Sequence, residues 1–496
     1  MVNSDGIRRP AVMLLNDKMI QNVIQEAKKI LEVVGIKLHD NEGLALLGSA
    51  GARIDREKQQ VFIPASLVEK CLKSVPPTIK LYDRYGNQQV VFGEDNFYFL
   101  PTSSNVKVWD SDKKQLQDPT VRDLIAFNRL VDALENLPIL PTNYYPVDIP
   151  SEINSLYRSF LCLKSSPKPI FASLIPTPRE NTDTLIKLAV AVRGSDEALE
   201  KKPLILCPVP TLSPLTWLED NYYMLTEYAR KKIPIQICMA PAMGVNAPVT
   251  ILGAVTQQMA EFFSGVVITQ LVNPGAPVIA GNYMEFFDMR LGTTCMGALE
   301  NYMGDMACAE IAKSLNIPSL VFMGCSDAKR PDFQAGLETG IGLVLGALSG
   351  ADLIQSVGGS ADLRVTSLEK LVIDNEICGM AYRLMQGITQ RGERLAEDLF
   401  SQGVFKGDHF LNSPNTMKWF KHEARYPGRS INRESIATWQ DTGCTTAEQR
   451  AREEVKRILA THDPEPLDPE INKKLIDIMT IYAKQNGVDK LPMPSS

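Results

Sequence analysis

The sequence predicts an α/β protein built on a closed (β/α)8 TIM barrel, with an N-terminal α+β layer before it and a C-terminal helical extension after it. Three observations lead to this prediction. Short apolar runs alternate with helical patterns from residue 96 onward. The alternation repeats eight times at intervals of about 30–45 residues, as expected of parallel strand–helix units. No second kind of sheet pattern interrupts it.

Residues 317–376 show the repeating unit most clearly. Apolar runs at Ser319–Met323 and Leu353–Val357 are strand-like, and a polar, glycine-containing loop follows each of them. Apolar residues recur at helical spacing in Phe333–Ser349 and Leu368–Met380. Strand, loop, helix and strand form a parallel crossover, which places every loop that follows a strand at the same end of the sheet.

The earlier units follow the same pattern. Six further apolar runs are Phe97–Leu100, Ile139–Pro141, Pro169–Ser173, Leu204–Cys207, Ile233–Cys238 and Pro277–Ala280. The helical patterns between the runs are Thr120–Leu134, Ser151–Leu163, Glu180–Val192, Trp217–Ala229, Val249–Leu271 and Met296–Leu315. An open doubly wound sheet is the main rival, but no GxGxxG follows a first strand and no GxxxxGK[ST] occurs. We therefore expect the closed barrel.

The chain on either side of the barrel differs in character. The N-terminal part shows helical patterns and short strand-like runs at Asp17–Val34, Asn41–Ser49, Val61–Ile63, Ala65–Ser74 and Ile79–Tyr82. The tail holds a charged helical pattern at Ala447–Leu459 and a Pro-rich linker. We expect three parts, at residues 1–95, 96–395 and 396–496, with the barrel as the catalytic part and the tail helices packed across it.

Composition limits the class of protein. A net charge of −6 argues against a general nucleic-acid binder. Nine cysteines show no CxxC pairing or regular spacing, which indicates reduced thiols in a cytoplasmic protein. No uninterrupted apolar run approaches the ~20 residues needed to span a bilayer, so we expect no membrane association.

The residues that follow each strand are the candidates for a site, because function in such barrels lies at the carboxyl ends of the strands. Asp327 and Lys329, after the seventh strand, are the catalytic candidates, and a structural ion pair is the alternative. The substrate-binding candidates are Tyr98, Ser103, Ser104, Asn143, Tyr144, Phe171, Met243, Asn282, Tyr283, Gln334, Gln355, Gly358 and Gly359. Each aromatic residue among them can equally belong to the barrel core.

The residue types that are absent from the predicted barrel limit the kind of chemistry and ligand expected there. No histidine occurs in the barrel, which argues against His-based acid–base catalysis and His-ligated zinc. Cys207, Cys238 and Cys325 lie near strand ends, but free cysteines are usually buried, so we expect no metal site. Aromatic faces with a carboxylate nearby are the usual way to hold a quaternary ammonium group.

Several segments resemble one family over residues 20–480, nearly the whole chain. They are ILEVVGIKLHDNEGLALLGSAGARID, FIPASLVEKCLKSVP, APVTILGAVTQQMAEFFSGVVITQLVNPGAPVIAG, CSDAKRPDFQAGLE, GADLI, LEKLVIDNEI and DHFLNSPNT. On these segments the chain resembles the trimethylamine methyltransferase superfamily, in its branch without pyrrolysine. The resemblance implies a (β/α)8 barrel that moves a methyl group from an amine to the cobalt of a separate corrinoid protein, with no cofactor tightly bound to the barrel itself.

The resemblance also directs the choice of substrate. Pyrrolysine is the residue usually held to activate a tertiary amine in this superfamily, and this barrel has only standard residues. A quaternary ammonium leaves as a neutral amine without such help, so we expect glycine betaine or a relative such as proline betaine, with carnitine and γ-butyrobetaine left open. Candidate anchors for the carboxylate are the amides of Ser103–Asn105 or Gly358–Ser360 and the side chains of Lys329, Arg330 and Arg364.

Two other classes of function stay open at this point. An enzyme with its own bound cofactor predicts a phosphate site at Gly358–Ser360, after the eighth strand. A betaine-binding protein without catalysis predicts the same mouth and no turnover. A methyltransferase for another methylated amine is a further alternative. By analogy with large soluble barrels, we expect a homo-oligomer.

Overall fold

The computed structural model describes residues 10–174, 178–392, 395–403 and 410–493. At its centre eight parallel strands follow the order β6-β19-β18-β15-β13-β11-β10-β9. The two end strands lie side by side, and the Ser104 amide after β6 donates to the Thr142 carbonyl after β9 at 3.1 Å. The predicted barrel is therefore confirmed. Its strands are β6 Tyr98–Pro101, β9 Leu140–Pro141, β10 Ile170–Phe171, β11 Ile205–Pro210, β13 Ile235–Met239, β15 Val278–Asn282, β18 Ser319–Val321 and β19 Leu353–Val357.

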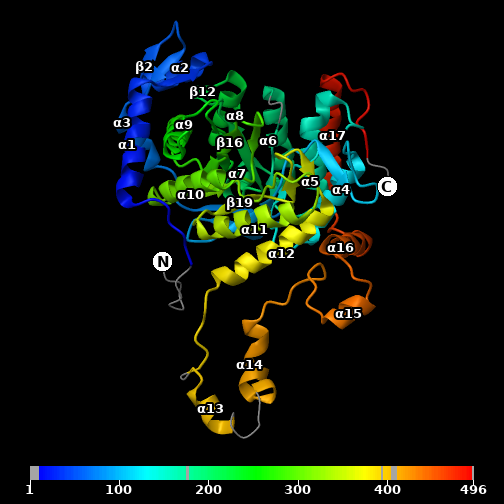
Figure 1. Cartoon of the computed structure of the whole chain (residues 1–496). Helices are drawn as coiled ribbons and strands as arrows, with labels where there is room; N and C mark the ends of the chain where they lie inside the picture. Colours follow the sequence, from blue (N-terminus) through cyan, green and yellow to red (C-terminus); the bar gives the residue numbers. More distant parts are fainter. Residues whose placement is uncertain (1–9, 175–177, 393–394, 404–409, 494–496) are drawn as a thin grey trace.

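Helices surround the strands (Figure 1). Some of them begin at a side-chain cap: Thr120 and Asp123 form a reciprocal capping box at the start of α4, and the Asp332 carboxylate accepts the amides of Gln334 and Ala335 in α11. The predicted helices all form, with ends that differ from the prediction by a few residues. They are α4 Val121–Ala133, α5 Ser151–Ser165, α6 Arg179–Arg193, α8 Glu219–Arg230, α9 Ile251–Val272, α10 Leu299–Ser314, α11 Phe333–Leu348 and α12 Leu368–Met385. The short helix α7 (Asp196–Lys201), between α6 and α8, was not predicted.

The N-terminal layer covers one side of the barrel and accounts for the most apolar helix. Helices α1 and α3 pack on the outer face of α9, whose inner face packs on the barrel. Among the described residues α9 is long and apolar enough to span a membrane by length and composition, but its most apolar stretch is 78% buried inside the protein. A helix that is apolar all round is expected where both faces are covered. The layer consists of α1 Asp17–Val33, β1 Ile36–Leu38, α2 Asn41–Ser49, β2 Arg53–Asp55, β3 Gln60–Phe62 and α3 Ala65–Leu72.

A hairpin of β4 (Ile79–Tyr82) and β5 (Gln88–Phe92) closes the amino-terminal end of the barrel. Its Tyr82 and Arg84 amides donate to Pro203 and Pro167, which precede barrel strands. Its inward side chains form one buried cluster with the inward residues of the strands: Ile79, Leu81, Val90, Phe92, Leu100, Ile139, Phe171, Leu206, Ile279, Leu320 and Leu353. A ligand therefore has to enter from the opposite, carboxyl end.

The carboxyl end carries short strands that the sequence analysis did not predict. The segment expected to be a loop after β19 forms β20 (Gly359–Ser360) and β21 (Val365–Thr366), which pair with each other. Strand β21 also pairs with β7 (Lys107–Asp110), from the segment that follows β6, so the pairing of β6 with β19 is continued beyond the carboxyl end of the barrel. Further short strands at this end are β8 Gln115–Gln117, β12 Thr216–Trp217, β14 Ala242–Met243, β16 Glu285–Asp288 and β17 Thr293–Cys295.

The tail helices differ in how they lie relative to the barrel. Helix α16 (Ala447–Thr461) packs on α12 and α4, and α17 (Pro469–Gln485) packs on α6 and α5. In contrast, α13 (Glu397–Gly403) and α14 (Pro414–Glu423) extend away from the barrel (Figure 1). The tail also contains η2 Phe410–Asn412 and α15 Ile436–Asp441. Asp408 and His409, which begin the DHFLNSPNT segment, lie outside the described residues.

Replacing Phe92 with alanine should destabilise the barrel by about 3–5 kcal/mol, because it removes a fully buried ring from the cluster that closes the amino-terminal end. Chemical denaturation followed by circular dichroism would measure the loss. Gln88→Ala, at an exposed position in the same strand, is the control and should leave stability nearly unchanged. Equal stability of the two variants would contradict a role of the hairpin in the core.

Candidate active site

A cavity of about 230 Å³ opens at the carboxyl end of the barrel. It is smaller than the ~300–1,000 Å³ typical of sites for drug-sized ligands, so it suits a small molecule. Four of its residues were predicted: Ser103, Ser104, Phe171 and Tyr283. The other lining residues are Ser173, Leu174, Pro208, Pro210, Cys238, Phe322 and Leu363.

Two aromatic rings form one wall of this cavity. Tyr283, which follows β15, stacks on Phe322, which follows β18, with ring centroids 4.3 Å apart and planes inclined by 34°. The Tyr283 hydroxyl donates to the Gln355 Oε1 at 2.5 Å, and the Gln355 amide reaches Ser103 Oγ at 3.4 Å. Burial raises the pKa of Tyr283, so its phenol stays neutral. Gln355 thus acts behind the wall, by orienting Tyr283.

An acidic edge lies beside the aromatic wall. Glu285 of β16 is within electrostatic reach of Asp362 and of Cys238, which lines the cavity. Burial raises the pKa of Glu285 to about 7, and the nearby Asp362 adds to the increase. Burial also raises the pKa of Asp362, although its carboxylate accepts a hydrogen bond from Thr294 Oγ1 at 2.9 Å. A cation placed at this edge would relieve the repulsion between the two acids.

A buried cation lies behind the serines on another part of the rim. The Arg158 side chain of α5 is fully buried, and its Nη1 reaches Asn143 O at 2.8 Å and Ser104 Oγ at 3.4 Å. Its Nη2 donates to Ser173 O at 2.8 Å and to the Tyr145 hydroxyl at 2.9 Å. Neither Arg158 nor Glu285 was a sequence candidate, because α5 was predicted only as a wall helix and β16 was not predicted.

Several predicted site residues lie outside the cavity lining. Tyr98 is the first residue of β6 and therefore lies at the closed end, where its hydroxyl accepts the Val91 amide at 3.1 Å. Tyr144 is fully buried and packs edge-on against Phe127 of α4. Four more are buried and engaged in structural contacts: Asn143 with Asn105 and Thr366, Asn282 with Gln258 and Leu320, Met243 in β14, and Gly359 against Thr102.

The loop after β18 holds the two catalytic candidates, and both side chains make local contacts there. Asp327 accepts the amides of Met296 and Gly297 at 2.9 and 3.0 Å, which ties this loop to the start of α10. Lys329 is exposed and donates to the carbonyl of Asp327 at 2.6 Å. Gln334, at the start of α11, donates to Glu338 at 2.9 Å. None of the three lines the cavity.

The anchors expected for a carboxylate are also engaged elsewhere. The amides of Ser104 and Asn105 donate to Thr142 O and Asn143 Oδ1, and the Gly358 amide donates to Asp374. Arg330 and Arg364 are exposed and lie 3.7 and 3.9 Å from Asp332 and Asp362, respectively. These contacts leave the prediction of a carboxylate anchor untested, and the three amides serve to connect neighbouring segments at the strand ends.

Comparison with known proteins identifies the family. The model of the trimethylamine methyltransferase family (MTTB) matches residues 4–486. The chain belongs to this family. A glycine betaine methyltransferase of Desulfitobacterium hafniense is 29% identical over 480 residues, with 96% of this chain and 98% of the relative covered. The trimethylamine methyltransferase MttB of Methanosarcina barkeri is 30% identical, with 90% of each chain covered. The protein is therefore a methyltransferase.

A solved structure supports the fold of this methyltransferase. The crystal structure of the Methanosarcina barkeri monomethylamine methyltransferase matches with a TM-score of 0.50, over 97% of this chain and 90% of that chain, at 11% sequence identity. At that identity the likeness concerns the fold alone.

The thiols of the methyltransferase are not arranged as a metal site in the described part of the chain, where no group of three or more His, Cys, Asp or Glu side chains gathers. Burial raises the pKa of Cys238 and of Cys325 to about 12, so both stay protonated near neutral pH.

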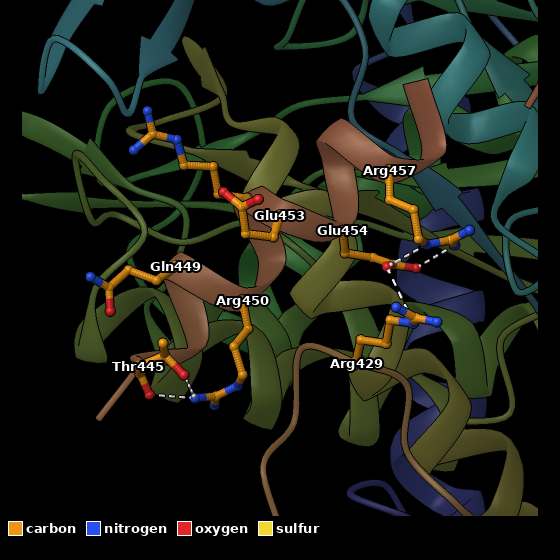
Figure 2. Close-up of a pocket in the computed structure, with 8 residues that line it drawn as sticks. Arg429, Thr445, Gln449, Arg450, Glu453, Glu454 and Arg457 are labelled. Atoms are coloured by element: carbon orange, nitrogen blue, oxygen red, sulfur yellow. Dashed lines mark hydrogen bonds and ion pairs between the residues drawn. The ribbon is translucent and has the colours of Figure 1, made fainter. Parts of the chain in front are cut away.

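A second hollow, of about 590 Å³, lies over α16 in the tail (Figure 2). Figure 2 shows Arg429 and Arg457 directed at Glu454, and Arg450 directed at Thr445. Arg452 pairs with Asp112. The arginines of this hollow therefore bind groups of the protein itself, and the barrel mouth is the better candidate for the active site.

Replacing Lys370 with methionine should cost the methyltransferase about 3–5 kcal/mol of stability, because it leaves a buried carboxylate without its cation. Lys370 Nζ lies 2.5 Å from Asp374, and both side chains are buried. Asp374 in turn accepts the amide of Gly358, a predicted binding residue that this contact places behind the rim. Thermal denaturation measures the effect.

The double variant Lys370→Met with Asp374→Leu is the matched control, because it removes both charges, and it should recover most of the lost stability. A single variant as stable as the wild type would contradict the pairing.

Proposed function

We propose that this methyltransferase removes a methyl group from a quaternary ammonium compound, glycine betaine or a close relative, and transfers it to the cobalt of a corrinoid carried by a separate protein. The observation that carries the proposal is the composition of the mouth: aromatic faces, serine hydroxyls and an acidic edge around a small cavity. Such a surface binds a cation through ring faces and charge.

The reaction needs little acid–base help from the protein. Cobalt(I) attacks the methyl carbon in line, the carbon–nitrogen bond breaks, and its electron pair stays on nitrogen. The products are methylcobalt(III) and a neutral tertiary amine, so no proton is transferred. The lining contains no Lys, His, Asp or Glu among the described residues, which agrees with a reaction that depends on positioning and desolvation.

Three further points support the proposal. One relative of nearly the same length is named glycine betaine methyltransferase, and the family model is that of trimethylamine methyltransferases. The closed amino-terminal end leaves the carboxyl mouth as the side from which a corrinoid protein can approach. The cavity is too small for a corrinoid as well as a substrate, which favours a corrinoid brought by a partner.

We assign catalysis to residues 96–395, between the N-terminal layer and the tail.

The first test is methyl transfer to free cob(I)alamin by the purified protein, followed by the absorbance of methylcobalamin. Glycine betaine, proline betaine, carnitine, γ-butyrobetaine and trimethylamine are compared. We expect a signal with one betaine and none with trimethylamine. A signal with trimethylamine alone would replace the proposed substrate. Silence with all five, repeated with a corrinoid protein, would favour a binding protein without catalysis.

The acidic edge predicts a pH dependence of ammonium binding. A bound cation favours the ionised form of Glu285, whose pKa burial raises to about 7, so affinity should rise as the pH increases from 6 to 8. Cys238, with a pKa of about 12, stays neutral over this range, and Asp362 is the other acid at the edge. Glu285→Gln should weaken binding at pH 8 by about fivefold and flatten the pH profile, as expected for ~1 kcal/mol.

Calorimetric titration with glycine betaine at several pH values measures this effect. The control is Glu300→Gln, which neutralises an exposed acid at the start of α10 and should leave the profile unchanged. A pH profile of Glu285→Gln that matches the wild type would contradict the assignment of the ammonium group to this edge.

A further inference from the structure

We propose that the mouth is built for a zwitterion, and that Ser104 and Ser173, backed by the buried Arg158, receive the carboxylate of the substrate. The inference rests on the proposed function and deepens it, because it names the residues that select a betaine over a simple ammonium ion.

The argument starts from the burial of Arg158. Its side chain is fully buried, yet no carboxylate among the described residues pairs with it; its polar partners there are carbonyls and hydroxyls. Its Nε is buried without a hydrogen-bond partner there, and its guanidinium stacks 3.7 Å from the Tyr145 ring centroid. A buried charge without a counter-charge is costly, so an anion nearby would be strongly favoured.

The cavity provides a place for that anion. Arg158 reaches Ser104 Oγ and Ser173 O, and both serines line the cavity, with their hydroxyl oxygens 3.3 Å apart. Ser104 has φ of +62°, a left-handed conformation that favours glycine over a residue with a side chain. A serine kept there at a conformational cost is consistent with a need for its hydroxyl. Two hydroxyls in front of a guanidinium form a suitable cradle for a carboxylate.

The topology puts the two charged edges on opposite sides of the mouth. Arg158 contacts the residues that follow β9 and its two neighbours, β6 and β10. Counting around the ring, β15 stands directly across from β9, and the chain that leaves β15 carries Tyr283 and Glu285. The mouth is therefore positive at one side, and aromatic and acidic at the other. A betaine has a carboxylate and a quaternary ammonium at its two ends and matches this order.

The inference predicts selectivity for the carboxylate end. Choline and glycine betaine share the trimethylammonium group, and only betaine carries the anion. The wild type should bind betaine at least about tenfold more tightly than choline, the ratio expected for one charge-assisted hydrogen-bonded anchor. Arg158→Lys, which keeps the charge and loses the fork geometry, should reduce this ratio by about tenfold, as should the double variant Ser104→Ala with Ser173→Ala.

The experiment is calorimetric titration of the purified protein with glycine betaine and with choline, together with the cob(I)alamin assay on each variant. Arg84→Lys is the matched control, because Arg84 is another buried arginine, located in the hairpin at the opposite end of the barrel. It should keep the wild-type ratio. If circular dichroism shows that Arg158→Lys does not fold, the ratio of betaine to choline affinity in the double serine variant tests the inference.

The outcomes separate this inference from the proposed function. A folded Arg158→Lys or double serine variant with an unchanged ratio of betaine to choline affinity overturns the inference while methyl transfer stands. A wild type that binds choline as tightly as betaine overturns it as well. A wild type that prefers betaine through Arg158 but methylates no corrinoid supports the inference and overturns the proposed reaction.

Discussion

The seam where β6 meets β9 is the constraint on which the carboxyl end of this protein depends. A barrel closes only if the two end strands of its sheet meet, and here these strands, β6 and β9, are short. The amide of Ser104 spans the seam to Thr142, and Arg158 contacts Ser104 Oγ after β6, Thr142 O and Asn143 O after β9, and Ser173 O after β10. On the other side of β6, strands β7 and β21 pair beyond the ends of β6 and β19. One buried guanidinium therefore holds three strand ends and at the same time sets the electrostatics of the cavity.

The opposite side of the mouth is organised by burial rather than by pairing. Burial raises the pKa of both Glu285 and Asp362, and the nearby Asp362 adds to the increase at Glu285. The stacked Tyr283 and Phe322 lie next to them. The lining of this cavity contains no Lys, His, Asp or Glu among the described residues. We infer that it contributes to methyl transfer by holding a charged substrate away from water, with one methyl group directed to the open end. Catalysis of this kind gains its rate from orientation of the reacting groups and from a preorganised electrostatic environment.

Sequence reasoning found the mouth residues that directly follow a strand and missed those that depend on neighbours. Ser103, Ser104, Phe171 and Tyr283 line the cavity because they lie at or just beyond strand ends. Tyr98 is the first residue of β6 and therefore lies at the closed, amino-terminal end of the barrel, away from the mouth. Tyr144 turns outward to Phe127, a choice made by packing against α4 that no local pattern encodes.

The sequence by itself determined the barrel, because the alternation of short apolar runs and amphipathic helices allows few other parallel arrangements. Its quoted segments were also sufficient to indicate the family. Only the tertiary structure decided which side chains share the mouth. Arg158 comes from a helix, Glu285 from an additional short strand and Phe322 from the end of an apolar run, and they meet because barrel closure brings distant segments to one rim. Charge complementarity across that rim is a property of the closed ring, and no stretch of the chain carries it alone.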